Sequence, residues 1–585
     1  MTASAASGPL RFGIMCGASG ISEFARVCIE QITKDKLGQP VLLIIDETES
    51  TRSSRSEKLR KSLRLDGNLW YLQSRLFPLN RIPAYRTVSL EGPFAGVDLI
   101  SCRPTKKGKW SYYFSAEDQE AIRSRQLDFI LKFTPFIIRG EVLKTARYGI
   151  WSFHHDDEEK YRGGPPAFWE IERGDPVTGA LLQRLTDRLD GGIVLKHCYA
   201  PTDGRSYRKN LQRIQESSAH MVRWVCLDIA GGRADYLDAP PSKTDAPIYH
   251  APNDFQMLRF WWRLGRNWIH YKLENQRVDE WNVGLVNAPQ AAFLDPGFVP
   301  ELEWTSYREK NQMVADPFLV PAGNEHRILV EEFNWATEKG RISEIRRRNG
   351  VSGELALVTP VIDEGIHMSY PFAFRHQGTT YAIPETGVTR NVVLYRLDEA
   401  AGTWSREATL LDNIDAVDAT VFEKDGTWWL AHSGSEGIAQ WSLYLWHAPS
   451  LFGPWEPHPA NPVKTDVSSS RPAGNLFWHE GKLYRPAQDG RLSYGSALAI
   501  NRIDALTRQV FAETVVRRVM PDPNSPYPDG LHTLSGVGSV CVVDAKKHRW
   551  PLGFLIRRHF AKRAGKPREG FRYSNVSPAP AAKIR

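Results

Sequence analysis

The C-terminal half of the chain repeats one pattern about every fifty residues, and this repeat restricts the fold more than any other feature. Each unit reads as an apolar strand, a glycine turn and a second strand that begins with an aromatic residue. Successive starts are 48 to 60 residues apart. A hairpin-based period of this length is typical of a β-propeller, so we predict five blades over 286–575. The five starts are Ala315-Asp-Pro-Phe-Leu319, Ser369-Tyr-Pro-Phe-Ala-Phe374, Val417-Asp-Ala-Thr-Val-Phe422, Ser470-Arg-Pro-Ala-Gly-Asn-Leu-Phe477 and Gly530-Leu-His-Thr-Leu534.

Each repeat places one polar or aromatic residue at the same position. These residues are Asp316, Tyr370, Asp418, Arg471 and His532. In a propeller, equivalent positions surround the central axis, and a ring of this composition suits sugar binding. Singly, each Asp or His could instead satisfy backbone groups at a strand end. For the set of five, we predict a substrate-binding pocket.

This half resembles the five-bladed propellers of glycoside hydrolases. It resembles still more closely the N-terminal region of plant glucosamine inositolphosphorylceramide transferases, through Asn461-Pro-Val-Lys464, 470–477 and Gly481-Lys-Leu-Tyr-Arg-Pro-Ala-Gln488. The hydrolase resemblance implies a base Asp in blade one and an auxiliary Asp in a middle blade, which Asp316 and Asp418 match. Arg471 stands where the acid Glu is expected, and a glycosidase needs a proton donor. We therefore favour recognition of a carbohydrate, with a propeller glycosidase or glycosyltransferase as an alternative.

The N-terminal half contains an alternating stretch, Ile150-Trp-Ser-Phe-His154, that predicts a strand. Side chains two apart on a strand share a face, so Ser152 and His154 point the same way. A hydroxyl, an imidazole and the later carboxylate of Asp190 can then converge on one reacting atom. Moving an acyl group onto an amine needs a base, an oxyanion donor and an acid that orients the base.

The segment from about 128 to 195 resembles the formyltransferases that use N10-formyltetrahydrofolate, including methionyl-tRNA and sugar N-formyltransferases. The matching pieces are Ser152-Phe-His154, Arg162-Gly163, Gly174-Asp175, Thr178-Gly179 and Leu189-Asp-Gly-Gly192. The resemblance implies an α/β domain with a parallel sheet over 1–238 and N10-formyltetrahydrofolate as formyl donor. Ser152 replaces the family's Asn, and a hydroxyl donates from a shorter arm than an amide. By position, the resemblance implies that His154, Asp190 and Ser152 are the catalytic residues. It implies that the donor is bound by Phe133, Thr134, Pro135 and Asp187. It also implies that Arg162 binds substrate or braces its loop.

The residues around His154 also permit other interpretations. The acidic run 155–160 favours a cationic acceptor such as an amino sugar if it lines the acceptor pocket. Ser152, His154 and Asp190 could form a hydrolase triad, but no Gly-x-Ser-x-Gly elbow surrounds Ser152. The cluster 154–157 could bind a metal, although consecutive residues on an extended chain point apart. A solvated acidic loop beside a strand-end histidine is the plainest alternative.

Alternation of strands and helices in the first 238 residues supports the α/β assignment. We predict strands over 11–16, 41–45 and 128–134, a helix over 22–31, a 140–144 helical piece and one long helical pattern over 205–230. A proline-rich run at 239–247 opens a linker over 239–285. Within it, 253–273 predicts a helix with an aromatic stripe and a basic face, capped by Asn253 or Asp254. Such a helix suits either an anionic membrane surface or packing against a neighbouring domain, and we favour the packing.

Composition limits the remaining possibilities. A chain of 585 residues is too long for one core, so two or three domains are expected. Its net charge of +8 is spread along the whole chain, which argues against a nucleic-acid partner. Its six cysteines form no CxxC pair, so we predict no metal site and no disulfide scaffold. The sequence also predicts no signal peptide and no membrane-spanning run, hence a cytoplasmic protein that can work at the inner membrane surface.

Taken together, the two halves predict an enzyme that formylates the amine of a nucleotide- or lipid-linked amino sugar in glycan or glycolipid synthesis. The alternative is a carbohydrate-binding protein whose formyltransferase domain has lapsed. The sequence does not distinguish the sugar, its carrier or the oligomeric state.

Overall fold

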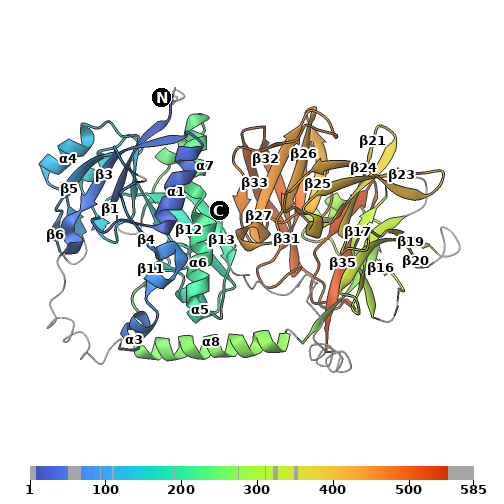
Figure 1. Ribbon diagram of the computed structural model, residues 1–585. Helices are drawn as coiled ribbons and strands as arrows, with labels where there is room; N and C mark the ends of the chain where they lie inside the picture. The colour runs from blue at the N-terminus through green and yellow to red at the C-terminus, as the bar shows by residue number, and fades with distance from the viewer. Residues whose placement is uncertain are drawn as a thin grey trace. The chain divides into compact units, whose positions relative to one another are not determined.

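The computed structural model describes residues 8–50, 68–92, 94–108, 111–188, 191–274, 276–307, 309, 311–320, 327–347 and 354–550. The chain divides into two compact units, Met1–Trp268 and Ile269–Arg585 (Figure 1). The division falls inside the long helix that the sequence predicts within 239–285.

A seven-stranded sheet forms the centre of the first unit, in the order β13-β12-β10-β8-β1-β3-β5. The five strands from β10 to β5 are parallel, as the strand and helix alternation predicts. Our expectation of a parallel sheet is wrong at one edge, where β12 and β13 run antiparallel. A short connection joins these two strands, and only an antiparallel pair can be joined that way. The strands are β1 (Leu10–Gly17), β3 (Gly38–Asp46), β5 (Asp98–Cys102), β8 (Phe129–Lys132), β10 (Ile150–His154), β12 (Val177–Arg184) and β13 (Ile193–Pro201).

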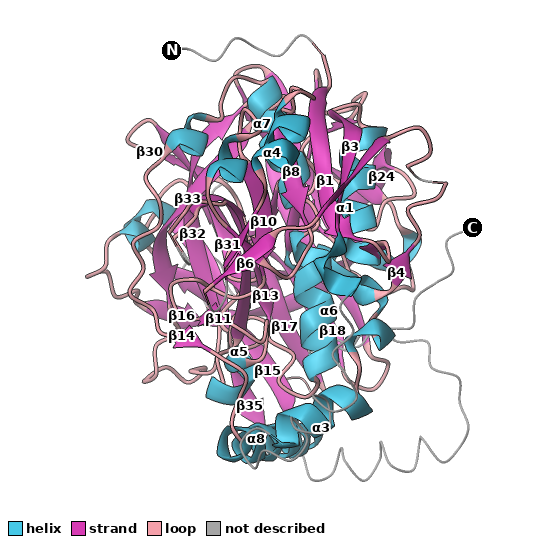
Figure 2. Cartoon of the chain, turned by 90° about the vertical axis from the view of Figure 1, so that its left-hand side faces the viewer, coloured by secondary structure: helices cyan, strands magenta, loops and turns pink. Residues whose placement is uncertain are grey.

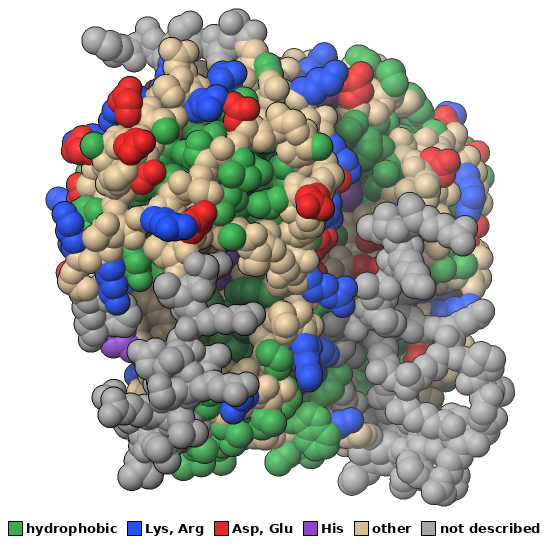
Figure 3. Space-filling view, turned by 60° about the vertical axis from the view of Figure 1, so that its left-hand side comes forward, with side chains coloured by type: hydrophobic (Ala, Val, Ile, Leu, Met, Phe, Trp, Pro, Cys, Tyr) green, Lys and Arg blue, Asp and Glu red, His purple; other side chains and the backbone are tan. Residues whose placement is uncertain are grey.

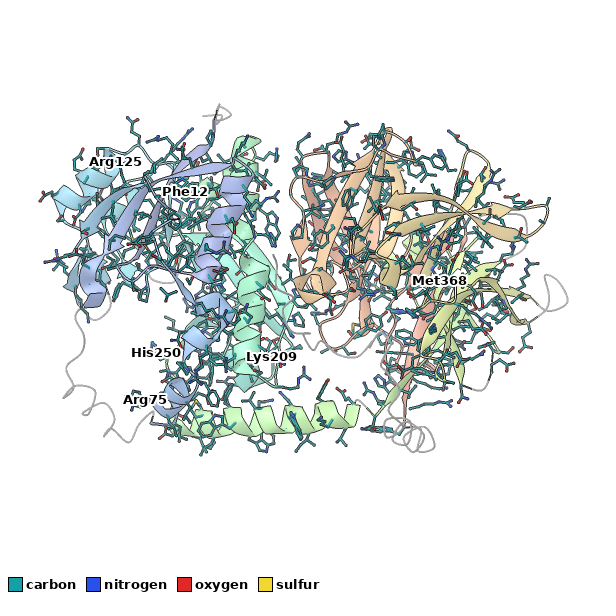
Figure 4. All side chains as sticks on the ribbon, in the orientation of Figure 1. Phe12, Arg75, Arg125, Lys209, His250 and Met368 are labelled. Carbon is teal, nitrogen blue, oxygen red and sulfur yellow. The ribbon has the colours of Figure 1, made fainter. Side chains whose placement is uncertain are left out.

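Both faces of this sheet are buried. One face contributes Met15, Ile44, Ile130 and Ile150 to an apolar cluster. On the other face, the ring of Phe129 stacks between those of Phe12, labelled in Figure 4, and Trp151, with centroids 5.2 and 4.1 Å away. Helices α6 and α7 pack against β12 and β13.

The sequence predicts one long helical pattern over 205–230, but the structure has two helices there. The first ends at Ser218 and the second begins at Met221. Ser22 caps α1 by accepting a hydrogen bond from Ala25 N at 3.2 Å. The helices of this unit are α1 (Glu23–Lys34), α3 (Asn68–Leu76), α4 (Ala116–Arg123), α5 (Trp169–Arg173), α6 (Tyr207–Ser218) and α7 (Met221–Ala230), and the predicted 140–144 piece is a 3-10 turn, η4 (Glu141–Lys144). The short strands are β2 (Ile21–Ser22), β4 (Thr87–Val88), β6 (Thr105–Lys107), β7 (Ser111–Tyr113), β9 (Ile137–Ile138), β11 (Arg162–Gly163) and β14 (Ile248–Tyr249).

Helix α8 (Asp254–Glu274) confirms the predicted helix at 253–273 and runs along the lower side of Figure 1. Asn253 is its cap: Asn253 Oδ1 accepts from Gln256 N and Gln256 Oε1 accepts from Asn253 N, both at 2.9 Å. None of the described helices is both long and apolar enough to cross a bilayer.

The second unit is all-β and contains five antiparallel sheets of four or five strands. Its first strand, β15, pairs with its last, β35, so the two ends of the unit share one sheet. The sheets are β16 (Leu302–Trp304), β15 (Val278–Val286), β35 (Val540–Arg549) and β34 (Leu534–Val537); β17 (Gln312–Leu319), β18 (Ile328–Asn334), β19 (Lys339–Arg347) and β20 (Leu355–Ile362); β21 (Ser369–His376), β22 (Thr379–Glu385), β23 (Val392–Asp398) and β24 (Thr403–Leu411); β25 (Val417–Lys424), β26 (Thr427–Ser433), β27 (Ser442–Ala448), β28 (Glu456–Pro457) and β29 (Lys464–Thr465); and β30 (Phe477–His479), β31 (Lys482–Asp489), β32 (Ala497–Leu506) and β33 (Phe511–Val519).

Hydrogen bonds near the repeat starts join each sheet to the next and the last sheet to the first. The series therefore closes on itself. Its members are Tyr370 N to Asp316 Oδ2 at 3.2 Å, Asp418 N to Glu385 Oε2 at 3.2 Å, Arg471 Nε to Asp418 Oδ2, Leu534 N to Ala473 O at 2.8 Å, and Thr533 Oγ1 to Asp316 Oδ1 at 3.1 Å.

Candidate functional site

Strand β10 holds Ser152 and His154 at its carboxyl end. Ile150 and Trp151 are buried and anchor the strand, whereas Ser152 and His154 are half-buried. Ser152 is paired in register with Gln183 of β12 and Lys132 of β8, and His154 with Leu181 of β12. The two side chains share a face of the strand, as the alternation predicts.

A buried carboxyl stands beside His154. Asp156 Oδ2 lies 3.8 Å from His154 Nε2, while Asp156 Oδ1 accepts a hydrogen bond from Ala167 N at 2.8 Å. Burial, reinforced by the nearby Glu170, raises the pKa of Asp156 well above its usual range. Asp190, which the sequence assigns to this role, lies outside the described residues. The repeated two-residue spacing 152, 154, 156 was the signal that could have pointed to Asp156.

Lys132 is a further charged residue of this region that sequence reasoning did not select. It ends strand β8, is buried, and donates from Nζ to Thr134 O at 2.6 Å. Burial lowers the pKa of Lys132 to about 8, with Asp46 acting in the opposite direction. Neighbouring strands lie about 4.8 Å apart, so the register places the Lys132 side chain beside that of Ser152 on the same face of the sheet. The sequence feature that could have pointed to Lys132 is a lysine in an otherwise apolar strand.

Replacing Lys132 by Met is expected to weaken catalysis while making the first unit more stable. A preorganised cation near a developing oxyanion is worth about a hundredfold in rate, so kcat for the acyl transfer that the sequence predicts should fall by about that factor. Methionine fills a similar volume without a buried charge. Steady-state kinetics and calorimetric melting of the full chain measure both effects.

The pH dependence of the melting temperature provides a control for the Lys132→Met experiment. Its folded pKa lies below that of an unfolded lysine, so the unfolded chain binds more protons between these values. Wild-type stability should therefore gain from this group as pH rises through about 8 toward 10. Lys132→Met should lack that gain. A variant that is less stable at pH 7 and equally active would contradict the assignment.

The predicted donor-binding residues occupy different surroundings. Thr134 is buried, and Pro135 is exposed. The ring of Phe133 packs with those of Phe24 and Phe153, at centroid distances of 6.5 and 6.4 Å. Phe153 points to the opposite face of β10 from Ser152 and His154, so Phe133 is not brought to their side.

Asp187 and Arg162 both tie loops together. Asp187 Oδ1 accepts from Gly140 N at 2.7 Å, and its carbonyl oxygen accepts from Arg139. Arg162 donates from Nε to Ala246 O at 2.6 Å, which is the bracing role that the sequence allowed for it.

The acidic loop after His154 is largely occupied with internal contacts. Asp157 Oδ1 accepts from Glu159 N at 3.2 Å, and Lys160 Nζ lies 3.0 Å from Asp175 Oδ2. His155 packs against Phe153 and Phe24, and burial lowers its pKa to about 3, so its ring is neutral. This loop therefore presents fewer free carboxylates to a ligand than its sequence suggests.

In the second unit, the structure brings the five repeat-start residues together. Asp316, Tyr370, Asp418 and His532 are buried, whereas the Arg471 side chain remains partly exposed. The Tyr370 hydroxyl accepts from Gly474 N at 2.7 Å and lies 3.0 Å from Thr420 Oγ1. Of these five side chains, Arg471 is the one that reaches solvent.

Three of these residues adopt a backbone conformation that side chains rarely take. The φ angles of Asp316, Tyr370 and Asp418 are 50°, 42° and 54°. Each lies at a break in strand register, where an extra residue turns the side chain away from its strand's normal face. Such strain costs about 1–3 kcal/mol per residue and persists only where the surroundings enforce it.

Further acids surround this position that the sequence did not single out. Burial raises the pKa of Glu385 to about 8, with help from Asp418, and that of Glu331 well above its usual value. The Glu385 carboxyl, with a pKa of about 8, is thus mainly protonated at neutral pH. Glu385 is buried, and its Oε2 accepts a hydrogen bond from Asp418 N at 3.2 Å.

Asp316, His532 and Asp544 place ligand-type atoms within 4.8 Å of one another. The carboxylate oxygens already have partners, however. Asp544 accepts from the backbone amides of Asp316, His532 and Thr533, and Asp316 accepts from Tyr370 N and Thr533 Oγ1. The cluster therefore serves as a junction between sheets.

Comparison with known proteins finds similarity to two kinds of transferase. The family model "Glucosamine inositolphosphorylceramide transferase 1, N-terminal" matches residues 301–526. The glucosamine inositolphosphorylceramide transferase 1 of Oryza sativa subsp. japonica is 34% identical over 214 residues, which is 35% of this chain and 28% of that protein. The methionyl-tRNA formyltransferase of Bacillus cytotoxicus is 23% identical over 234 residues, which is 38% of this chain and 69% of that protein. The chain thus spans little more than a quarter of the plant relatives it matches.

Two solved structures illustrate the fold comparisons. An N-formyltransferase from Helicobacter canadensis, in complex with folinic acid and dTDP-3-aminofucose, aligns at 11% identity over 43% of this chain and 80% of that chain, with a TM-score of 0.28. A family 117 glycoside hydrolase from Zobellia galactanivorans aligns at 13% identity over 44% of this chain and 93% of that chain, with a TM-score of 0.29.

Proposed function

We propose that the first unit transfers a formyl group from N10-formyltetrahydrofolate to the amine of an amino sugar. We propose also that the second unit is a five-bladed propeller that recognises a carbohydrate. The observation that carries the first proposal is the placement of Ser152 and His154 on one face at the carboxyl end of β10, with Lys132 alongside. Similarity to methionyl-tRNA formyltransferases supports it.

These residues supply what acyl transfer to nitrogen requires. The donor provides an activated formyl carbon. His154 Nε2 accepts the proton that the amine loses as its nitrogen bonds to that carbon, directly or through water. Ser152 Oγ and the Lys132 ammonium stabilise the negative charge that develops on the formyl oxygen. His154 then gives the proton to the nitrogen that leaves.

The surroundings of β8 fit a polar heterocyclic donor. Among the described residues, the buried hydroxyl of Thr134 has no hydrogen-bond partner, although buried polar groups are nearly always satisfied. Thr134 lies two residues after Lys132, and Lys132 Nζ donates to its carbonyl oxygen, so its hydroxyl and the lysine can bind one ligand.

The propeller proposal is supported by the five sheets and by the closed series of hydrogen bonds between them. Shared pairing of β15 and β35 supports ring closure as well. In such a ring, the exposed part of Arg471 faces solvent beside the ring of Tyr494, 5.2 Å from its centroid. A cation and an aromatic face together suit binding of a sugar that carries a negatively charged group.

The deciding experiment incubates the full-length protein with N10-formyltetrahydrofolate and a panel of nucleotide-linked and lipid-linked amino sugars. We expect one class of sugar to gain a single formyl group, seen by mass spectrometry. The matching N-acetyl sugars, which lack a free amine, should not react. No product with any sugar, together with no calorimetric affinity for a folate analogue, would overturn the formyl-transfer proposal and favour a carbohydrate-binding protein.

A further inference from the structure

Helices α3 and α8 carry several large hydrophobic side chains that the described structure leaves exposed. On α8, Phe255 is 72% and Trp262 is 60% exposed, and on α3 Leu76 is 56% exposed. We call this surface the α3–α8 patch; it consists of Leu72, Leu76, Phe77, Phe255, Leu258 and Trp262. The packing that the sequence favoured for this stripe is therefore absent among the described residues.

The two helices are held together as one platform. Trp261 Nε1 donates to Gln73 Oε1 at 2.6 Å, and Leu69 N donates to Asp254 Oδ1 at 2.9 Å. Figure 2 shows α8 end-on at the foot of the view with α3 beside it. Leu72 and Leu76 are one turn apart on the flank of α3 that contains Leu69 and Gln73.

The opposite side of α8 anchors the platform to the first unit. Phe260 stacks on Phe168 with ring centroids 4.4 Å apart, and Asn267 Nδ2 donates to Gly204 O at 2.9 Å. Arg259 pairs with the buried Glu172. The helix is thus fixed by its inner side, and its apolar stripe is presented outward.

Basic residues accompany the stripe. Between Phe255 and Leu273, α8 contains four basic and no acidic residues: Arg259, which is paired with Glu172, and Arg263, Arg266 and Lys272. Arg266 lies over the ring of Trp262, 5.3 Å from its centroid. Figure 3 shows hydrophobic side chains gathered at the lower edge of the molecule with basic ones beside them, and Figure 4 labels Arg75 on α3 there.

We propose that the α3–α8 patch is a peripheral membrane-binding surface for an anionic lipid bilayer. Aromatic and leucine side chains enter the boundary between headgroups and acyl chains, and the flanking arginines meet lipid phosphates. A single exposed hydrophobic residue is common on protein surfaces. Six exposed hydrophobic residues on two joined helices, with basic residues beside them, indicate an interaction surface. This inference does not depend on the proposed formyl transfer.

The test is flotation of the full-length protein with vesicles of phosphatidylcholine alone or mixed with phosphatidylglycerol. We expect binding to the anionic vesicles, weakened by salt because the Arg contribution is screened. Phe255→Ser combined with Trp262→Ser should lower the partition coefficient at least tenfold, since both side chains lose their transfer from water to lipid. Arg266→Glu combined with Lys272→Glu should weaken binding to anionic vesicles only.

A matched control uses the same residue types elsewhere. Phe452 and Trp478 of the second unit are 53% and 57% exposed, and Phe452→Ser with Trp478→Ser should leave vesicle binding unchanged. Equal loss in both pairs would overturn the proposal. Wild-type protein that does not bind vesicles would overturn it as well. This holds whether the protein self-associates through the patch, seen as a mass that depends on concentration, or stays monomeric.

Discussion

Changing His154 to Ala is expected to lower kcat for formyl transfer by about a thousandfold, in the middle of the range for loss of a positioned general base. The backbone of β10 should remain in place, because its pairing with Leu181 uses no side-chain atom of His154. Rapid-quench measurement of formylated product, at saturating amino sugar, isolates this effect from binding. Affinity for a folate analogue should stay within a few-fold of wild type.

His250→Ala is the matched control, since His250 is exposed in the same unit and should keep full activity. Ser152→Ala offers a second comparison, because losing a single oxyanion donor should raise the barrier by about 3 kcal/mol. If His154→Ala retained more than a tenth of wild-type kcat, the base would be another group and the proposed chemistry of β10 would be wrong.

The second large effect concerns stability, at Arg485. This residue lies in the segment 481–488 that resembles the plant transferases, and it is 1% exposed. Its guanidinium donates to both carboxylate oxygens of Glu513, at 2.9 and 2.6 Å, and to the carbonyl oxygens of Ser469 and Ser470. Arg485→Met leaves these acceptors with fewer partners, which costs about 3–5 kcal/mol for a buried pair.

Such a loss is expected to lower the melting temperature of the second unit by roughly 10 °C. Differential scanning calorimetry of the full chain measures it. Arg406→Met is the matched control, because Arg406 makes the same two-pronged pair with Glu364 at the surface, where such pairs contribute about 0–1 kcal/mol.

Arg485→Met combined with Glu513→Leu should recover most of the lost stability. The second change removes the stranded carboxylate, and Lys464, its other partner, retains access to water. A single Arg485→Met variant that melts like wild type would contradict this account of the buried pair.

Local structure was largely readable from the sequence. The alternation in 150–154 predicts β10, and the confirmed helix at 253–273 follows from its cap at Asn253 and its apolar spacing. Two predictions of local structure failed. Strand β12 runs antiparallel to both β10 and β13, and the helical pattern over 205–230 is divided between Ser218 and Met221.

The candidate site shows the same division. Ser152 and His154 share a face because a strand has a two-residue period, a property that needs no tertiary information. The sequence does not predict Lys132 and Asp156 as site residues. Lys132 lies beside Ser152 because of the register between β8 and β10, and Asp156 is buried in a loop whose sequence is typical of a solvated one.

By itself, the sequence determined the α/β character of the first half, the five-fold β repeat of the second and the amphipathic form of α8, because residue spacing sets these. Only the tertiary structure decided which acids stay protonated, which of the five repeat-start residues reaches solvent and whether the α8 stripe is covered. Those properties depend on burial and on partners far along the chain, which local spacing does not encode.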